Sequence, residues 1–288
     1  MTAIGRVGVW SGEIARAEPH EAASAAALAE QAGYGAVWLP GGSTSAPFAV
    51  VAEILAATTR LVAATGVLNI WNHTATGLAT AHRSLRARHG DRFLLGMGVS
   101  HAPVVDRAEP GRYASPLRVL ASFLDGLDAG GAVPASERVL AALGPKMLAL
   151  AAVRAAGAHP YHVTPEHTRF AREILGRDPL LAPEQAVVLE KHPARARGLA
   201  RQHLAVYFGL PNYVRSWRRQ GFGDDDLCGG GSDRLVDALV PWGSAAHVGR
   251  RVSEHFDAGA DHVCVQVIGD ADGSVPIREW TELAGRIG

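Results

Sequence analysis

The sequence predicts an α/β fold, a TIM (β/α)8 barrel with a helical insertion after the seventh strand. Short apolar runs bounded by glycine and proline alternate along the chain with longer segments of helical period, which is the pattern of repeated βα units. Eight such runs occur in 288 residues, and eight is the strand number of a barrel that typically spans about 250 residues. An open doubly wound sheet is the alternative, but it usually has fewer strands. We expect a single domain over residues 1–288.

The expected strands are apolar or β-branched runs that end at glycine, proline or a small polar residue. They lie at residues 4–10, 36–39, 61–68, 92–99, 138–143, 158–163, 185–189 and 262–268. The third run is almost wholly apolar, as expected for a parallel strand that helices cover or that lines a barrel.

The expected helices lie between these strands and are bounded by proline and glycine. Pro19 opens the first helix and Gly33 closes it, which is the order that helices prefer. Further helices are expected from Pro47, over 74–89 and 116–127, and from Pro145 and Pro165. After the seventh strand the alternation stops. Three helices in succession are expected there, at residues 194–220, 233–242 and 245–258.

Composition excludes several classes of protein. Twenty-eight Lys and Arg balance 28 Asp and Glu, so no basic surface for nucleic acid is expected. The two cysteines, Cys228 and Cys264, form no CxxC motif, and the 13 histidines are scattered without HExxH, so no metal site is expected. The chain shows no signal-peptide pattern and no apolar run long enough for a membrane span. We therefore expect a cytoplasmic protein that acts on a small molecule.

Residues at the carboxyl ends of the expected strands are the candidates for an active site, because barrel enzymes place their sites there. These positions are rich in glycine, aromatic and neutral polar residues. They carry no pair of carboxylates, which disfavours glycoside hydrolysis. His101 and His162 are too few for metal-dependent hydrolysis. A site of this composition favours cofactor chemistry, in which the protein binds and orients a reactive group.

The best candidate for a phosphate site is the turn from the sixth strand into the next helix, Val163 to Thr168. Free backbone N–H groups and the positive end of a helix bind phosphate, and Thr164, His167 and Thr168 could add side-chain donors. An ordinary helix N-cap explains the same residues equally well. The GxG at Gly96–Gly98 lacks the third glycine of the dinucleotide fingerprint and is weak support for NAD.

Several segments, in order and over nearly the whole chain, resemble the luciferase-like monooxygenase superfamily, and within it the oxidoreductases that use the deazaflavin coenzyme F420. The segments are AEQAGYGAVWLP at 29–40, RLVAATGVLNIW at 60–71, RFLLGMGVSHAPVV at 92–105, LAALGPKMLALAA at 140–152, GAHPYHVTPEHT at 157–168 and LPNY at 210–213. The resemblance implies a TIM barrel with a late helical insertion, two-electron redox chemistry and a homodimer.

The resemblance also implies roles for individual residues. A non-prolyl cis peptide bond, which is rare in proteins, is implied between Gly66 and Val67, where the flavin-like ring would pack. Asn69 would bond near the ring, and Ser100 would line the site. The cofactor tail would be held by residues after the sixth strand: Tyr161, His162, Val163, Thr164, His167 and Thr168.

His101 is our candidate for a general acid or base, because it follows the fourth strand and histidine titrates near neutral pH. A histidine that only hydrogen-bonds the cofactor or the backbone explains the position equally well. Trp10 and His73 are candidate substrate contacts, although Trp10 could equally serve packing. The chain departs from its relatives after Pro40, where glycine replaces the common acidic residue, so an acid/base or substrate role of that position is lost. Relatives that oxidise sugar phosphates have a histidine and a tryptophan near this strand, and this chain has neither beyond Trp38, so a sugar-phosphate substrate is not supported.

The sequence therefore predicts an F420-dependent oxidoreductase that transfers a hydride between the deazaflavin and a small organic substrate. Two alternatives stay open. One is an FMN-dependent luciferase-like monooxygenase, because the two cofactors have ring systems of the same shape. The other is a paralogue that binds a cofactor without catalysis.

Overall fold

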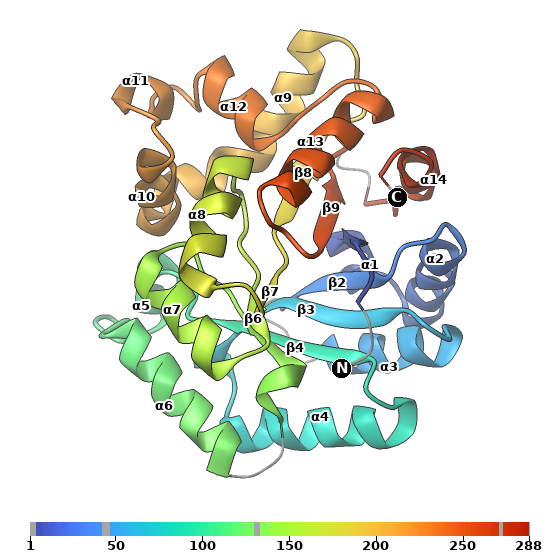
Figure 1. The fold of residues 1–288 in the computed structure, drawn as a ribbon, viewed down its shortest axis with the longest axis vertical. Helices are drawn as coiled ribbons and strands as arrows, with labels where there is room; N and C mark the ends of the chain where they lie inside the picture. The colour runs from blue at the N-terminus through green and yellow to red at the C-terminus, as the bar shows by residue number, and fades with distance from the viewer. Residues whose placement is uncertain (1–3, 42–46, 130–132, 271–272, 288) are drawn as a thin grey trace.

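The computed structural model describes residues 4–41, 47–129, 133–270 and 273–287. Within them, one parallel sheet has the strand order β7-β6-β5-β4-β3-β2-β1-β9-β8 (Figure 1). The strands are β1 Val7–Trp10, β2 Ala36–Gly41, β3 Val62–Asn69, β4 Phe93–Gly98, β5 Arg138–Leu140, β6 Gly157–Ala158, β7 Leu180–Leu181, β8 Glu184–Val187 and β9 Val263–Val267.

The sheet closes on itself because β7 and β8 are two parts of one extended segment. On one side of this segment, the Leu180 amide donates to the Ala156 carbonyl over 2.7 Å. On the other side, the Cys264 amide donates to the Pro183 carbonyl over 3.0 Å. Pro183 lies between the two parts and has no amide hydrogen for a strand ladder. The barrel therefore has eight strands in space, and the predicted TIM barrel is confirmed.

In the described part of the chain, eight helices surround the barrel, and contacts join each of them to the next in a closed ring. They are α2 Pro19–Gln31, α3 Pro47–Ala57, α4 Ala75–His89, α6 Pro116–Ala129, α7 Pro145–Arg154, α8 Pro165–Leu175, α13 Ala245–Asp257 and α14 Ile277–Ala284. Five of them begin at proline, as the sequence predicts, because the fixed φ of proline suits the first helical position. Two short helices, α1 Gly12–Arg16 and α5 Ala102–Ala108, follow β1 and β4.

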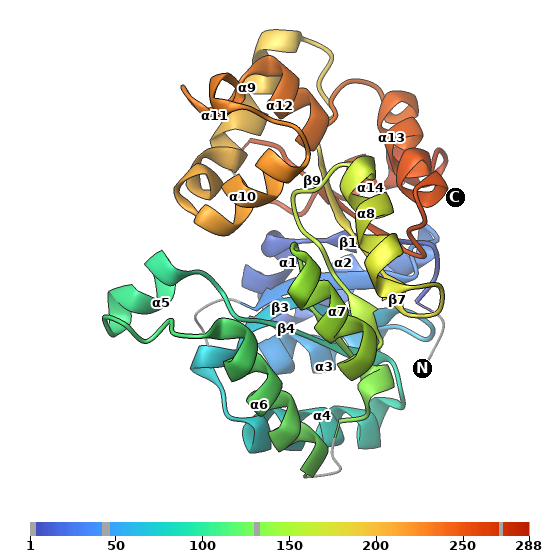
Figure 2. The same ribbon diagram turned by 60° about the vertical axis from the view of Figure 1, so that its left-hand side comes forward.

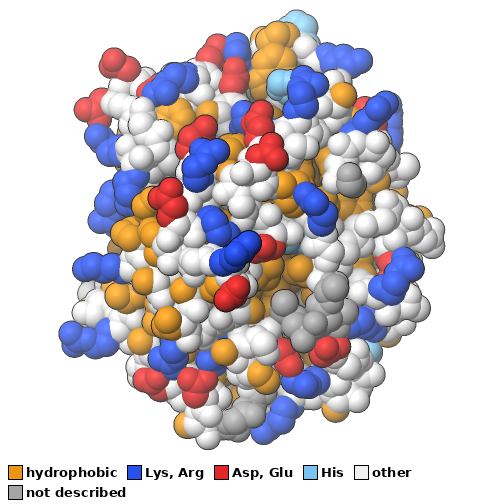
Figure 3. Space-filling model, in the orientation of Figure 1, with side chains coloured by type: hydrophobic (Ala, Val, Ile, Leu, Met, Phe, Trp, Pro, Cys, Tyr) orange, Lys and Arg blue, Asp and Glu red, His pale blue; other side chains and the backbone are white. Residues whose placement is uncertain are grey.

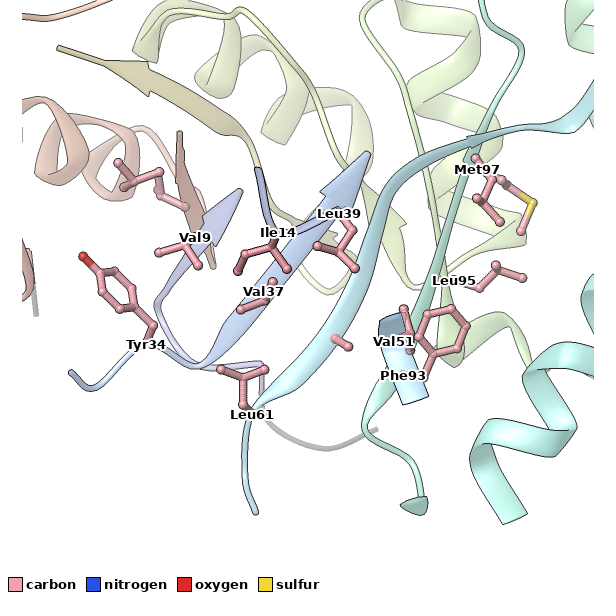
Figure 4. Close-up of a cluster of buried hydrophobic side chains, with 14 of the residues drawn as sticks. Val9, Ile14, Tyr34, Val37, Leu39, Val51, Leu61, Phe93, Leu95 and Met97 are labelled. Carbon is pink, nitrogen blue, oxygen red and sulfur yellow. The ribbon is translucent and has the colours of Figure 1, made fainter. Parts of the chain in front are cut away.

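The main core lies between the sheet and the helices. Val9, Val37 and Leu39 point outward from their strands toward this layer, together with Leu95 and Met97 (Figure 4). Their spacing of two residues follows from the alternation of side chains along a strand. Each fully buried side chain of this kind contributes about 1.5–3 kcal/mol.

The inside of the barrel is filled by a different set of side chains. Most of them are small, including Ala36, Ala64 and Cys264, and one is the fully buried indole of Trp38. The polar side chains of His159 and His262 lie against this indole. The barrel therefore holds a group of polar aromatic side chains below its carboxyl end.

The predicted helical insertion is present between β8 and α13, and the views show it grouped at one end of the molecule (Figure 2). It comprises α9 Pro193–Leu204, the 3-10 helix η3 Ala205–Gly209, α10 Pro211–Arg219, α11 Asp224–Leu227 and α12 Asp233–Leu239. It has a core of its own around Trp217, which is fully buried.

Several expected elements differ from the structure, among them the strand expected over 138–143, which ends at Leu140, and the helix expected over 233–242, which ends at Leu239. The helix expected over 194–220 is divided, because Pro211 starts a new helix after η3. The strand expected over 158–163 ends at Ala158, and His162 has a left-handed backbone with φ of 53° that no strand continues through. The strand expected at 185–189 begins earlier and includes Glu184. Boundaries are the least predictable feature of such elements.

The surface mixes charges of both signs. On the face in Figure 3, basic and acidic side chains alternate between apolar patches, which agrees with the balanced composition. In the described part of the chain, no helix is both long and apolar enough to cross a membrane.

Candidate functional site

A cavity of about 700 Å³ opens at the carboxyl ends of the first six strands, β1 to β6. This volume lies within the range of about 300–1,000 Å³ that is usual for ligand pockets. Strand residues and the residues just after them form its floor: Trp10, Pro40, Gly66, Val67, Gly98, His159 and Tyr161. Side chains of the insertion form the opposite wall: Tyr207, Asn212, Tyr213, Arg215 and Arg219. Among the described residues that line the cavity, none is Asp or Glu.

The floor of the cavity is the end of β3. The peptide bond between Gly66 and Val67 is cis, as the resemblance implies. The indole Nε1 of Trp10 donates to the Gly66 carbonyl oxygen over 3.0 Å. A Cβ atom on Gly66 would lie 2.8 Å from this Nε1 and 3.0 Å from Nε2 of His159. Glycine therefore leaves room for two polar ring atoms at the floor.

The residues after β4 form one side of the cavity. Ser100 has a left-handed backbone with φ of 56°, a conformation that is uncommon for residues other than glycine and clusters at functional sites. Its carbonyl oxygen accepts a hydrogen bond from the Tyr113 hydroxyl over 3.1 Å. His101 follows it, packs its ring at 5.2 Å from that of Tyr213, and lines the cavity.

Asn212 of the insertion decides the tautomer of His101. Arg215 donates to Oδ1 of Asn212 over 2.8 Å, so the oxygen of this amide faces Arg215. The amide nitrogen then faces Nδ1 of His101 at 3.4 Å and donates to it. In the neutral imidazole the proton is therefore on Nε2. Burial lowers the pKa of His101 from its ordinary value of 6.5, so the neutral ring prevails at pH 7.

Tyr161 lines this cavity and contacts a residue that lines a second one. Its hydroxyl donates to Oε1 of Gln266 over 2.8 Å and accepts from the Tyr207 hydroxyl over 3.3 Å. Burial raises the pKa of Tyr161 well above its ordinary value, so the hydroxyl stays protonated. Gln266 lines the second cavity, of about 810 Å³, at the ends of β8 and β9. Its lining carries carboxylates as well as arginines, including the ion pair of Arg195 and Glu190.

A buried carboxyl group lies behind Tyr161. Glu184 is fully buried, and its Oε2 accepts from the backbone amide of His162 over 3.2 Å. Burial raises the pKa of Glu184 to about 8, so its side chain is mostly protonated at neutral pH. Burial also lowers the pKa of His162 well below its ordinary value. The two neighbouring groups are therefore both neutral, which avoids an isolated charge in the interior.

Three basic side chains surround the outer part of the cavity, and we call them the basic rim: Lys146, Arg215 and Arg219. Lys146 is in the first turn of α7, where backbone N–H groups are free and the helix end is positive. Arg219 donates to the Leu143 carbonyl over 3.1 Å beside this turn. Arg215 and Arg219 are four residues apart on α10, a spacing at which like charges repel. Desolvation and the charge of Arg215 lower the pKa of Arg219, so an anion at the basic rim would relieve this repulsion.

Comparisons with known proteins agree with this geometry. The family model for luciferase-like monooxygenases matches residues 2–130, which carry β1 to β4. The predicted resemblance to this family is confirmed. A comparison with curated proteins finds no match.

Solved structures with the luciferase-like fold match over almost the full chain. An F420-dependent secondary alcohol dehydrogenase in complex with an F420-acetone adduct has a TM-score of 0.73 at 14% identity, with 98% of each chain covered. The coenzyme F420-dependent tetrahydromethanopterin reductase from Methanopyrus kandleri has a TM-score of 0.70 at 15% identity, with 98% of this chain and 97% of that chain covered.

An FMN-bound structure is similar to the same degree. It is the oxygenating constituent of 3,6-diketocamphane monooxygenase from Pseudomonas putida, a type II Baeyer-Villiger monooxygenase, with a TM-score of 0.70 at 14% identity. The match covers 97% of this chain and 95% of that chain. At these identities the similarity establishes the luciferase-like fold and leaves the cofactor of this chain to be argued from its own residues.

The luciferase-like fold brings six of the predicted site residues together in the cavity: Trp10, Gly66, Val67, Ser100, His101 and Tyr161. Two others lie outside its walls. Oδ1 of Asn69 accepts from the backbone amide of Trp71 over 3.3 Å and so caps the 3-10 helix η1, Ile70–Asn72. His73 follows this helix and is half-buried. Contacts of these two residues with cofactor or substrate stay predictions.

The predicted phosphate turn is buried behind the cavity wall. His162, Val163, Thr164, His167 and Thr168 are each at most 3% exposed, and none of them lines the cavity. The Thr164 amide already donates to the side chain of Gln220 over 3.0 Å. The Thr168 hydroxyl lies 2.8 Å from Nδ1 of His255. Their contact with a cofactor stays a prediction that this geometry does not favour.

Sequence reasoning missed His159 and the contribution of the insertion. The LPNY segment carries Asn212 and Tyr213, which line the cavity, and the segment LAALGPKMLALAA carries Lys146 of the basic rim. Both segments are among those that carry the resemblance, which was the available signal that their residues belong to the site. Arg215 and Arg219, four residues apart on α10, were a further signal for an anion site. Neither arginine has a carboxylate three or four residues away on this helix.

Proposed function

We propose that this chain is an F420-dependent oxidoreductase that transfers a hydride between the deazaflavin and a small organic substrate. One observation carries the proposal. The cavity over the Gly66–Val67 cis bond has the basic rim at its outer part and, among the described residues, no carboxylate in its lining. The tail of F420 carries a phosphate and several carboxylates, whereas FMN carries one phosphate. A rim of three cations suits the longer anionic tail better.

The residues present fit such a cofactor. A flat ring system needs a floor without bulky side chains, and Gly66 supplies it, because a Cβ atom there would approach Trp10 and His159. A flavin-like ring also carries polar edges, and Nε2 of His159 is a buried polar atom at this floor. When bound, the deazaflavin would supply two-electron hydride chemistry.

The chain's own residues would bind and orient the reactants. Trp10 holds the carbonyl of Gly66 and so fixes the floor. Lys146, Arg215 and Arg219 would hold the anionic tail at the outer end. Leu117, Leu143 and Met147 line the cavity with apolar surface, which suits a small apolar substrate and reduces the water around it. Orientation of this kind supplies a large part of the rate in such reactions.

His101 would hold the proton that the reaction needs. Asn212 donates to its Nδ1, so Nε2 carries the proton in the neutral ring. This N–H can donate to an oxygen of the substrate and stabilise the negative charge on it, and when Nδ1 is protonated as well the ring can give the Nε2 proton to that oxygen and become neutral. The predicted homodimer and the cytoplasmic location stay predictions.

Titration of the purified protein with F420 and, separately, with FMN tests the proposal. We expect F420 to bind with micromolar affinity and FMN at least tenfold more weakly, a difference of about 1.4 kcal/mol. A panel of small alcohols and carbonyl compounds is then screened for oxidation or reduction of the bound cofactor. Tighter binding of FMN would instead favour the FMN-dependent monooxygenase. Binding of F420 without turnover by any compound would favour a paralogue that lacks catalysis.

A further inference from the structure

His159 carries a buried polar atom that no described residue satisfies. The residue follows β6, is 2% exposed and lines the cavity, and its Nε2 has no hydrogen-bond partner among the described residues. A buried acceptor without a partner costs about 1–3 kcal/mol. Such atoms at a cavity wall are candidates for contact with a ligand.

The protonation of this ring follows from its other nitrogen. Nδ1 of His159 lies 2.7 Å from the carbonyl oxygen of Ala182. A carbonyl oxygen only accepts, so Nδ1 carries the proton and Nε2 offers a lone pair. Burial lowers the pKa of His159 to about 4, and the ring is therefore neutral at pH 7. Nε2 is an acceptor and never a donor under these conditions.

Neighbouring aromatic groups fix the ring without satisfying Nε2. Trp38 stacks on His159 at 4.3 Å with an angle of 12° between the rings. The Nε1–H of Trp38 donates to Nε2 of His262 over 3.0 Å, and the Nε1–H of Trp10 donates to the Gly66 carbonyl over 3.0 Å. Both nearby indole N–H groups therefore already donate to other acceptors. A donor for His159 has to come from the cavity.

We propose that Nε2 of His159 accepts a hydrogen bond from the imide N–H of the flavin-like ring and so sets how the ring lies over Gly66 and Val67. This inference rests on the proposed function. Oxidised deazaflavin and flavin each carry one N–H within the ring system, between two carbonyl groups. The carbonyls are acceptors and cannot pair with a lone pair, so the imide N–H is the complementary group. Nε2 lies 3.0 Å from where a Cβ of Gly66 would be, which places the acceptor at the floor.

Nitrogen NMR of the protein labelled with ¹⁵N-histidine tests the contact directly. We expect the ¹⁵N chemical shift of Nε2 of His159 to move upfield when F420 is added. It should remain within the range of an unprotonated nitrogen. His255 is the internal control, because its Nε2 is already 2.9 Å from Oε1 of Gln185. An unchanged Nε2 resonance of His159 in the F420-saturated protein would overturn the inference.

Two variants separate the acceptor from the structural role of the ring. In His159→Asn the amide can still donate to the Ala182 carbonyl, but it cannot reach the cavity. In His159→Gln the longer side chain can place an oxygen near the position of Nε2. We expect His159→Asn to lower the affinity for the deazaflavin ring about tenfold or more and His159→Gln to restore most of it. Thermal unfolding of both variants shows whether each is folded.

A matched pair of ligands completes the test. The probes are 8-hydroxy-5-deazariboflavin and the same compound methylated at the imide nitrogen. Methylation should weaken binding at least tenfold in the wild-type protein and less than threefold in His159→Asn, because the contact is already lost there. Equal losses in both proteins would overturn the inference and leave the proposed function intact. If the wild-type protein binds neither F420 nor the unmethylated ring, the proposed function fails, and the inference with it.

Discussion

The indole Nε1 of Trp10 donates a hydrogen bond to the carbonyl oxygen of Gly66 over 3.0 Å, so the end of β1 holds the end of β3 in position. Both residues line the cavity. The bond joins residues 56 positions apart in the sequence and fixes the floor on which the ring is proposed to lie. A side chain that was a candidate for stacking on a substrate thus has a definite role in shaping the site.

Replacement of Trp10 by phenylalanine removes this N–H donor and keeps an aromatic ring. We expect the free energy of unfolding to fall by about 1 kcal/mol, the usual net contribution of one hydrogen bond, and the affinity for F420 to fall several-fold. Denaturant unfolding and fluorescence titration measure the two effects. Trp71→Phe is the matched control, because it removes a similar bond to the Val99 carbonyl from an indole that does not line the cavity. Equal losses of affinity in both variants would contradict the proposed role of Trp10.

Arg215 and Arg219 should bind the cofactor tail and leave the ring unaffected. Replacement of either by glutamine is expected to weaken F420 binding roughly tenfold at low ionic strength, with little change for 8-hydroxy-5-deazariboflavin, which lacks the tail. Added salt should reduce the difference between wild-type protein and variant. Arg218→Gln is the control on the same helix, because Arg218 forms an ion pair with Asp224 and does not line the cavity. A similar loss for both ligands would place these arginines elsewhere than at the tail.

His101 should make the rate of the reaction depend on pH in the acidic range, and this part of the pH–rate profile is called its acidic limb. Burial lowers its pKa below the ordinary value of 6.5, so the neutral ring, with its proton on Nε2, is lost only as the pH falls below 6.5. Protonation of Nδ1 keeps the Nε2–H and makes it a stronger donor, so the rate of carbonyl reduction should be constant above this pH and increase below it. His101→Gln should remove the limb and lower the rate about 100-fold or more, within the usual contribution of a proton-transferring group. His20→Gln, at an exposed histidine, should retain the wild-type profile. If the acidic limb persists in His101→Gln, it comes from the titration of another group.

The sequence predicted the barrel and part of its site because both depend on local patterns. Gly66 lies in the last part of β3, and Ser100 and His101 follow β4. The apolar runs of both strands are plain in the sequence, and strand ends meet at one edge of a parallel barrel. Asn212 and Arg219 were not predicted, because their approach to His101 and Leu143 depends on how the insertion packs on the barrel.

The turn at Thr164 shows what local sequence patterns do not predict, namely whether another segment covers a helix start. Pro165 begins α8 as predicted, and such a helix start is compatible with a phosphate site. The insertion covers this turn, since Gln220 accepts from the Thr164 amide and the Trp217 indole donates to the His162 carbonyl. A helix start that looks open in the sequence is thus covered by residues 55 and 56 positions later. His159 was missed for a related reason, because its ring is held by Trp38 of β2 and by Ala182 between β7 and β8.

Glu184 should make the protein less stable as the pH rises. Burial raises the pKa of its carboxyl group from the ordinary value of 4.5 to about 8, so between these values the folded state holds a proton that the unfolded chain releases. The free energy of unfolding therefore falls as the pH rises from about 4.5 to 8, by at most about 1.4 kcal/mol per pH unit from this group. Below pH 4.5 both states are protonated, and the group contributes no pH dependence.

Glu184→Gln removes this titration and keeps the shape of the protonated side chain, including an oxygen for the His162 amide. We expect the variant and the wild-type protein to have similar stability near pH 4.5 and the variant to be the more stable by a margin that grows up to pH 8. Denaturant unfolding at several pH values measures the difference. Glu282→Gln, at an exposed position of α14, should follow the wild-type profile. Parallel profiles for Glu184→Gln and the wild-type protein would mean that Glu184 is ionised in the folded state, with its charge satisfied by the amide of His162 and by groups around Tyr161.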